Sequence, residues 1–203
     1  MIETYKGLTI RLEYDQDCES PLECDEGVHI TYRKDARYVL GNTPEDSDQH
    51  AETAARIESG DLIGFAVYAY IHSGVVLSAA PFSCPWDSGQ SGFIYVDRAT
   101  ALEWHGGKIL TAKKRAATIN SLHGVLQSYS DWQSGECYRY VIEDPAGEKL
   151  DSCCGFIGYD YALQEARGQA DGCIKHMARE AKARTASARA GFAAAQQRRQ
   201  VMA

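Results

Sequence analysis

The sequence lacks the features that place a protein in a membrane or in the secretory pathway. Its 203 residues contain no apolar run near the ~18–20 residues of a membrane span. The longest stretch without Asp, Glu, Lys or Arg covers residues 62–86, and His72 and two prolines interrupt it. The first residues, Met1–Lys6, have neither the basic nor the apolar segment of a signal peptide. We therefore expect an intracellular, cytoplasmic protein with no membrane partner.

Cysteine is present, but without the spacing that marks a disulfide scaffold or a zinc site. The chain has 7 Cys, an odd number, and contains neither a CxxC nor an HExxH motif. Small secreted disulfide scaffolds are denser and more regular in cysteine. We therefore expect reduced thiols. Zinc ligands would have to converge from distant parts of the chain, and neither a metal nor a cofactor is predicted.

Positive charge is scarce over most of the chain. The net charge is −7, but residues 1–162 carry −12 and residues 163–203 carry +5. A protein that coats duplex DNA needs a positive surface against the phosphates. The body of this protein is therefore excluded as a general DNA binder, whereas nucleic acid stays open as a partner of the C-terminal segment.

The chain contains both strand and helix patterns. Apolar periodicity predicts strands over 9–14, 28–33, 65–71, 75–78, 92–96, 137–143 and 149–153. Helices are predicted over 51–59, after a polar loop at 41–49, and from the N-cap Thr111 to Gly135. The expected fold class is α+β. A core domain over 1–158 has a mixed or antiparallel sheet of about five to seven strands with the long helix packed on it. An Ala-rich helical arm covers 159–203.

A central loop contains the residues best suited to catalysis. A cysteine nucleophile needs a base, usually histidine, and a third group that orients this base. Cys84 is the candidate nucleophile, His72 from the preceding turn the base, and Asp87 the orienting group. The alternative is a half-buried structural thiol in a loop anchored by Phe82 and Trp86.

The tripeptide Asp87-Ser88-Gly89 also occurs in proteases, but its surroundings differ. Chymotrypsin-like enzymes have glycine on both sides, where this chain has Trp86 and Gln90. Aspartic proteases have an apolar strand before the aspartate, and this chain does not. We therefore expect a turn with positive φ at Gly89.

Two charged segments are candidate partner-binding surfaces. An acidic loop carries Asp15, Asp17 and Glu19, preceded by Glu13 and followed by Glu23, Asp25 and Glu26. It can be a solvated face, a surface for a basic partner, or a Mg²⁺ or Ca²⁺ site, although an EF-hand's Gly and final Glu are absent. The C-terminal segment carries the basic residues Arg179, Lys182, Arg184, Arg189, Arg198 and Arg199. They suit an acidic partner, or they form the solvent-exposed face of a helix without a partner.

Three stretches share a pattern with a known group of proteins. They are YDQDCESP (14–21), HSG (72–74) with PFSCPWDSGQSGFIYV (81–96), and DSCCGF (151–156), the last preceded by acidic residues at 143–148. Together they resemble a family of small, mostly uncharacterised bacteriophage and prophage proteins that recurs across unrelated phages. The likeness covers residues 8–158, with departures at Cys24, Ala79, Ala80 and Cys154.

The resemblance implies an accessory protein that acts inside the infected bacterium. Such proteins often bind and block host machinery, including CRISPR and restriction systems. Because no catalytic motif is complete, we expect a non-enzymatic binder of a host protein or complex. Its expected contacts are Asp15, Asp17, Glu19, Trp86, Arg179, Lys182, Arg184 and Arg189. The alternatives are a cysteine-dependent enzyme that uses Cys84 and a minor component of the virion.

Overall fold

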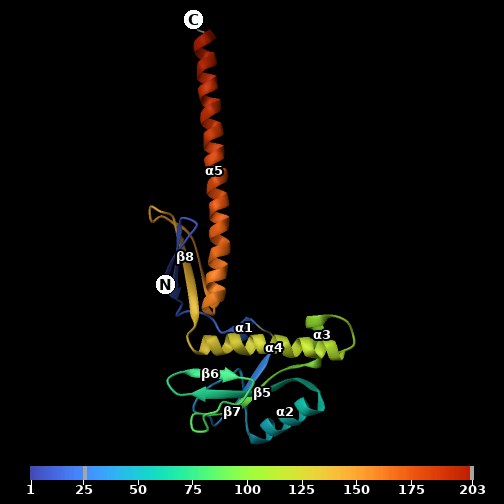
Figure 1. Ribbon diagram of the computed structural model, residues 1–203. Helices are drawn as coiled ribbons and strands as arrows, with labels where there is room; N and C mark the ends of the chain where they lie inside the picture. Colours follow the sequence, from blue (N-terminus) through green and yellow to red (C-terminus); the bar gives the residue numbers. More distant parts are fainter. Residues whose placement is uncertain (25–26, 202–203) are drawn as a thin grey trace. The chain divides into compact units, whose positions relative to one another are not determined.

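The chain folds into two compact units with separate cores. The computed structural model describes residues 1–24 and 27–201 (Figure 1). The terminal unit consists of Met1–Glu13 and the chain from Tyr138 onward, and the central unit consists of Tyr14–Cys137. These boundaries differ from the expected division at residue 158. They differ because the strands near both ends of the chain pair with one another and the last helix packs on them.

The terminal unit is a four-stranded sheet covered by one long helix. Its strands are β1 (Ile2–Tyr5), β2 (Leu8–Tyr14), β8 (Cys137–Glu143) and β9 (Lys149–Ile157), in the order β1-β2-β8-β9. Helix α5 (Tyr159–Val201) follows directly. Alternate residues of β2 and β8 point into the core, where they meet an alanine from successive turns of α5. These core residues are Leu8, Ile10, Leu12, Tyr138, Tyr140, Ile142, Ala162, Ala166 and Ala170.

Helix α5 continues well past this core (Figure 1). Every residue from Lys175 to Gly191 is exposed. Within the described part of the chain, no helix is both long enough and apolar enough to cross a membrane. Alanine and charged side chains make up most of residues 175–191.

The central unit is a mixed five-stranded sheet between helices. Its strands are β3 (His29–Arg33), β4 (Thr43–Glu45), β5 (Leu62–Ile71), β6 (Val75–Ser78) and β7 (Ser88–Asp97), in the order β4-β3-β7-β5-β6. The β3–β4 pair is parallel and the other pairs are antiparallel. Helix α4 (Ala112–Gln133) covers one face and α2 (Ser47–Ser59) the other, and α1 (Pro21–Cys24) and α3 (Arg98–His105) complete the unit (Figure 1).

The predicted α+β class is confirmed, as are the long helix and the C-terminal helix. The N-cap role of Thr111 is also confirmed, because its hydroxyl accepts from the Lys114 backbone N–H. The predicted strands fall into two sheets rather than one, because β2, β8 and β9 form a sheet of their own with β1. The sequence also did not indicate β1, β4, α1 and α3.

The predicted loop at 41–49 is wrong in part, because it contains β4 and the first turn of α2. The helix begins before the predicted Ala51, at Ser47. Asp46 and Gln49 cap it reciprocally: each side chain accepts the other residue's backbone N–H, at 3.0 and 3.1 Å.

Candidate functional site

The antiparallel pairing of β5 and β7 builds the candidate site of the central unit. Tyr70 pairs with Ser88, and the Ile71 N–H donates to the Asp87 carbonyl at 2.8 Å. This register places His72, which follows β5, beside Asp87, which precedes β7. Ser88 and Gly89 are therefore strand residues, and the predicted turn with positive φ at Gly89 is wrong. Gly89 instead pairs with Ala69 of β5.

The structure brings together the three residues predicted for catalysis. His72 Nδ1 lies 3.5 Å from Asp87 Oδ2, and Cys84 Sγ lies 3.8 Å from the same oxygen. A hydrogen bond from the Ser88 hydroxyl to the Cys84 carbonyl closes the intervening turn. The carboxylate is thus shared by the thiol and the imidazole.

This order of groups differs from that of a cysteine-dependent enzyme. In such an enzyme the imidazole is next to the sulfur and takes its proton, and the carboxylate holds the far side of the ring. Here Asp87 contacts both Cys84 and His72, and the His72 side chain is largely exposed. The hydrogen-bond partner of the Cys84 thiol is therefore a carboxylate, which is not the usual neighbour of a cysteine nucleophile.

The two aromatic residues of the loop have different surroundings. Phe82 packs on Tyr70 with ring centroids 5.7 Å apart, so this residue anchors the loop. Trp86 is 92% exposed, so the expectation that it also anchors the loop is wrong. A tryptophan side chain this exposed buries almost none of its large apolar area within the described residues.

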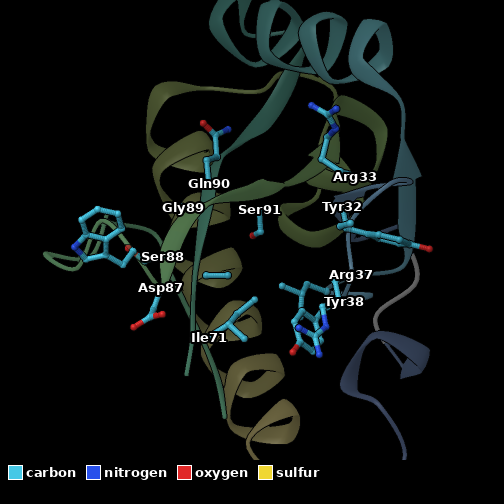
Figure 2. Close-up of a pocket in the computed structure, with 14 residues that line it drawn as sticks. Tyr32, Arg33, Arg37, Tyr38, Ile71, Asp87, Ser88, Gly89, Gln90 and Ser91 are labelled. Carbon is cyan, nitrogen blue, oxygen red and sulfur yellow. The ribbon is translucent and has the colours of Figure 1, made fainter. Parts of the chain in front are cut away.

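Trp86 is among the residues that line a pocket of about 470 Å³. Figure 2 shows this pocket with Arg37 and Tyr38 on one side and Asp87 and Ser88 on the other. Ala69 and Ile71 of β5, with Leu40, supply its apolar surface. The segment after β3 forms another wall, where the Arg37 guanidinium lies 5.3 Å from the Tyr38 ring centroid. The full lining is Tyr32, Arg33, Ala36, Arg37, Tyr38, Leu40, Ala69, Ile71, Trp86, Asp87, Ser88, Gly89, Gln90 and Ser91.

No protein-family model, no curated protein and no solved structure matches this chain. The chemistry of the lining residues therefore indicates what kind of site this is. An apolar floor with polar and aromatic groups at the rim is the usual composition of a binding pocket.

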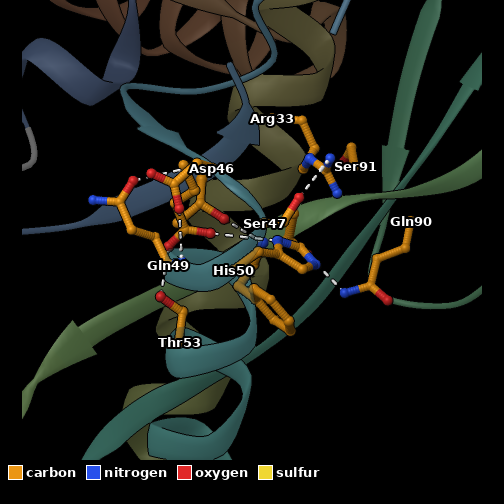
Figure 3. A network of polar contacts seen from close by, with 12 residues as sticks. Arg33, Asp46, Ser47, Gln49, His50, Thr53, Gln90 and Ser91 are labelled. Atoms are coloured by element: carbon orange, nitrogen blue, oxygen red, sulfur yellow. Dashed lines mark hydrogen bonds and ion pairs between the residues drawn. The ribbon is translucent and has the colours of Figure 1, made fainter. Parts of the chain in front are cut away.

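A buried polar network lies close to this pocket, and the sequence did not indicate it (Figure 3). Glu45 is 4% exposed, accepts a hydrogen bond of 2.5 Å from Thr53, and has Oε2 3.4 Å from His50 Nδ1. The His50 ring packs on Phe93, with centroids 4.6 Å apart. Burial and the charge of Glu45 raise the pKa of Tyr95 on the same sheet.

Arg33 connects the network to the pocket. Its guanidinium donates to the Ser47 hydroxyl at 3.1 Å and to Asp35 at 3.2 Å, and it also lines the pocket (Figure 3). The capping pattern Asp-x-x-Gln at 46–49 was the available signal for the start of this helix. It gives no sign that Glu45 and His50 are buried together.

The acidic loop is divided between the two units. Glu13 belongs to the terminal unit, where Arg139 Nη2 donates to it at 2.6 Å. Asp17 and Glu19 of the central unit are exposed, and the Asp17 N–H donates to the half-buried Asp15 at 3.3 Å. Across residues 1–24 and 27–201, no group of three or more His, Cys, Asp or Glu could hold a metal ion. Asp25 and Glu26 lie outside the described residues.

The basic residues of the arm are exposed along α5. Arg179, Lys182, Arg184 and Arg189 are all exposed, and Arg184 pairs at 3.5 Å with Glu180 one turn earlier. The side chains of Arg198 and Arg199 lie outside the described residues. The arm therefore offers at least four cationic side chains along one helix.

Proposed function

We propose that this protein is a non-enzymatic binding protein of a bacteriophage that acts on a macromolecule of its bacterial host. The recognition surface is Trp86 with the adjoining pocket, and the acidic loop and the arm add charged contacts. The observation that carries this proposal is the 92% exposure of Trp86 at the pocket rim. Tryptophan is among the residues that most often dominate binding energy in protein interfaces.

The chemistry of the loop supports binding rather than catalysis. The Cys84 sulfur and the His72 ring both contact Asp87, so the hydrogen-bond partner of the thiol is a carboxylate rather than the imidazole that usually activates a cysteine nucleophile. The phage origin, the cytoplasmic location and the class of target follow from the resemblance of the three motifs to phage accessory proteins. On that basis the target is host defence machinery of the CRISPR or restriction type.

A photo-crosslinking experiment tests the recognition surface. A benzophenone amino acid replaces Trp86 in one variant and Ile109 in a matched control. Ile109 is another exposed apolar residue of the central unit and does not line the pocket. We expect a defined host protein to be crosslinked from position 86 in infected or expressing cells and not from position 109. Absence of a crosslink from position 86, or the same products from both positions, contradicts the proposal.

Substitutions then rank the contacts once the partner is known. W86A should weaken binding by about tenfold or more, as expected for an aromatic anchor. Charge removal in the arm (R179A, K182A, R184A, R189A) or in the loop (D15N, D17N, E19Q) should have smaller effects that fade with added salt. C84S should bind and act like the wild type. Loss of cellular effect in C84S with binding intact would instead favour the cysteine-dependent enzyme.

A further inference from the structure

Two cysteines of the central unit lie close together although 119 positions separate them in the chain. Cys18 follows β2, and Cys137 is the first residue of β8. The Asp15 N–H donates to the Cys137 carbonyl at 2.8 Å. The indole N–H of Trp132 donates to the Cys18 carbonyl at 2.9 Å. These backbone contacts fix both cysteines where the chain enters and leaves the central unit.

The two cysteines also belong to one site. Both cysteines line one pocket of about 360 Å³, so small oxidants have access to them. Cys18 is partly exposed, whereas Cys137 is only 4% exposed. The two thiols therefore differ in access but share one site.

Burial and the neighbouring Cys18 raise the pKa of Cys137 to about 12, and the charges of Asp15 and Glu136 add to this effect. Cys137 is therefore protonated near neutral pH. Because Cys18 is the more exposed of the two thiols, it is the one that an oxidant meets first.

We propose that Cys18 and Cys137 form a disulfide when the protein is exposed to a two-electron oxidant such as hydrogen peroxide. The Cys18 thiolate attacks one peroxide oxygen, the O–O bond breaks, and the released hydroxide takes a proton to become water. This step leaves Cys18 as a sulfenic acid. The Cys137 sulfur then attacks the Cys18 sulfur and expels hydroxide, which takes the Cys137 proton as a second water. Two thiols and one peroxide thus give one disulfide and two waters.

The bridge would join the first and last segments of the central unit. It would close a loop of about 120 residues, and closing so long a loop restricts the unfolded chain strongly. Oxidation should therefore raise the unfolding temperature of the central unit. This inference does not depend on the proposed binding function.

Peptide mapping of the full-length protein tests the proposal. The reduced protein is treated with hydrogen peroxide, blocked with N-ethylmaleimide, digested without reductant and analysed by mass spectrometry. We expect a linked peptide pair containing Cys18 and Cys137, and the loss of two free thiols per chain. C18S should remove the linked pair, whereas C84S, the matched control with another half-buried thiol, should retain it.

The pH dependence of the reaction gives a second readout in the wild type. If Cys137 resolves the sulfenic acid as its thiolate, bridge formation should accelerate by up to about tenfold per pH unit between pH 7 and 9. Oxidation of Cys18 to sulfinic acid without a bridge, or pairing of Cys18 with another cysteine, would overturn the proposal.

Discussion

In the central unit, α4 is held on its sheet by large aliphatic side chains, whereas α5 is held in the terminal unit by alanines. Ile30, Ile63, Ile94 and Leu122 are all at most 1% exposed in the central core. In the terminal unit, Ala162, Ala166 and Ala170 are completely buried against tyrosine and leucine side chains of the sheet. Side chains of both the helix and the sheet thus fill the central core. In the terminal core, the side chains of the sheet fill most of the space.

This difference predicts opposite sensitivities. Removal of volume leaves a cavity in the central core, where large side chains interlock. Addition of volume disturbs the terminal core, where an alanine in each of three successive turns allows α5 to lie close to the sheet. Two substitutions test this contrast, and a third tests a helix cap of the central unit.

The largest effect is expected from I94A in the central unit. Ile94 lies on β7 between β3 and β5 and is completely buried. The lost contacts and the cavity should reduce the free energy of unfolding by about 2–5 kcal/mol. Urea unfolding measures the total loss, and hydrogen exchange with mass spectrometry locates it. I109A, at a 69% exposed position, is the control. Equal loss of protection in β5 and in β2 would contradict two separately stabilised units.

An intermediate effect is expected from A166L in the terminal unit. The larger side chain has no space between α5 and the sheet, so we expect a loss of about 1–3 kcal/mol. Increased exchange should be confined to β2, β8 and the first half of α5. A186L adds the same side chain to an exposed turn of the same helix and should change stability little. A stable A166L with unchanged exchange would show that the alanine contacts are not close-packed.

The smallest effect concerns Asp97, the N-cap of α3 in the central unit. Its carboxylate accepts the Thr100 N–H at 2.8 Å, and this bond lowers the pKa of Asp97 below the usual 3.8. D97A should cost about 1 kcal/mol at pH 7. D97N keeps a capping oxygen and should cost less.

The pH dependence of this effect follows from the direction of the pKa shift. Because the pKa is lower in the folded state, the charged cap contributes its stability above about pH 4 and loses it as the pH falls through the folded-state value. The advantage of the wild type over D97N should therefore shrink as the solution is acidified below pH 4, as measured by urea unfolding at each pH. A constant difference across that range would contradict the role of the charge.

Local features of the fold could be predicted from the sequence. The turn at His72–Gly74 and the apolar runs beside it predicted the β5–β6 hairpin, and Thr111 predicted the start of α4. The pairing of distant strands could not be predicted, because strand propensity does not specify a partner. The sequence therefore did not indicate that β8 pairs with β2, which is what separates the two units.

The candidate site, too, could be predicted only where its residues lie close together in the sequence. Cys84, His72 and Asp87 were found because they lie within one hairpin and loop, although their order in space was not foreseen. The opposite wall of the pocket, with Arg37 and Tyr38, comes from a segment about 50 residues earlier, which the β3–β7 pairing brings close. The pocket that Cys18 and Cys137 share joins residues that are still farther apart in the chain.

The β2–β8 pairing also determines which of the two units can fold first during synthesis on the ribosome. The central unit is completely synthesised once Cys137 has emerged, whereas the sheet of the terminal unit must wait for β8 and β9, and its core for the start of α5. Domains generally fold as units during synthesis. The central unit can therefore fold while β2, which precedes it in the chain, is paired with β1 but still lacks its other partner β8. The β1–β2 pair thus completes its sheet only after the central unit, which follows it in the chain, has been synthesised.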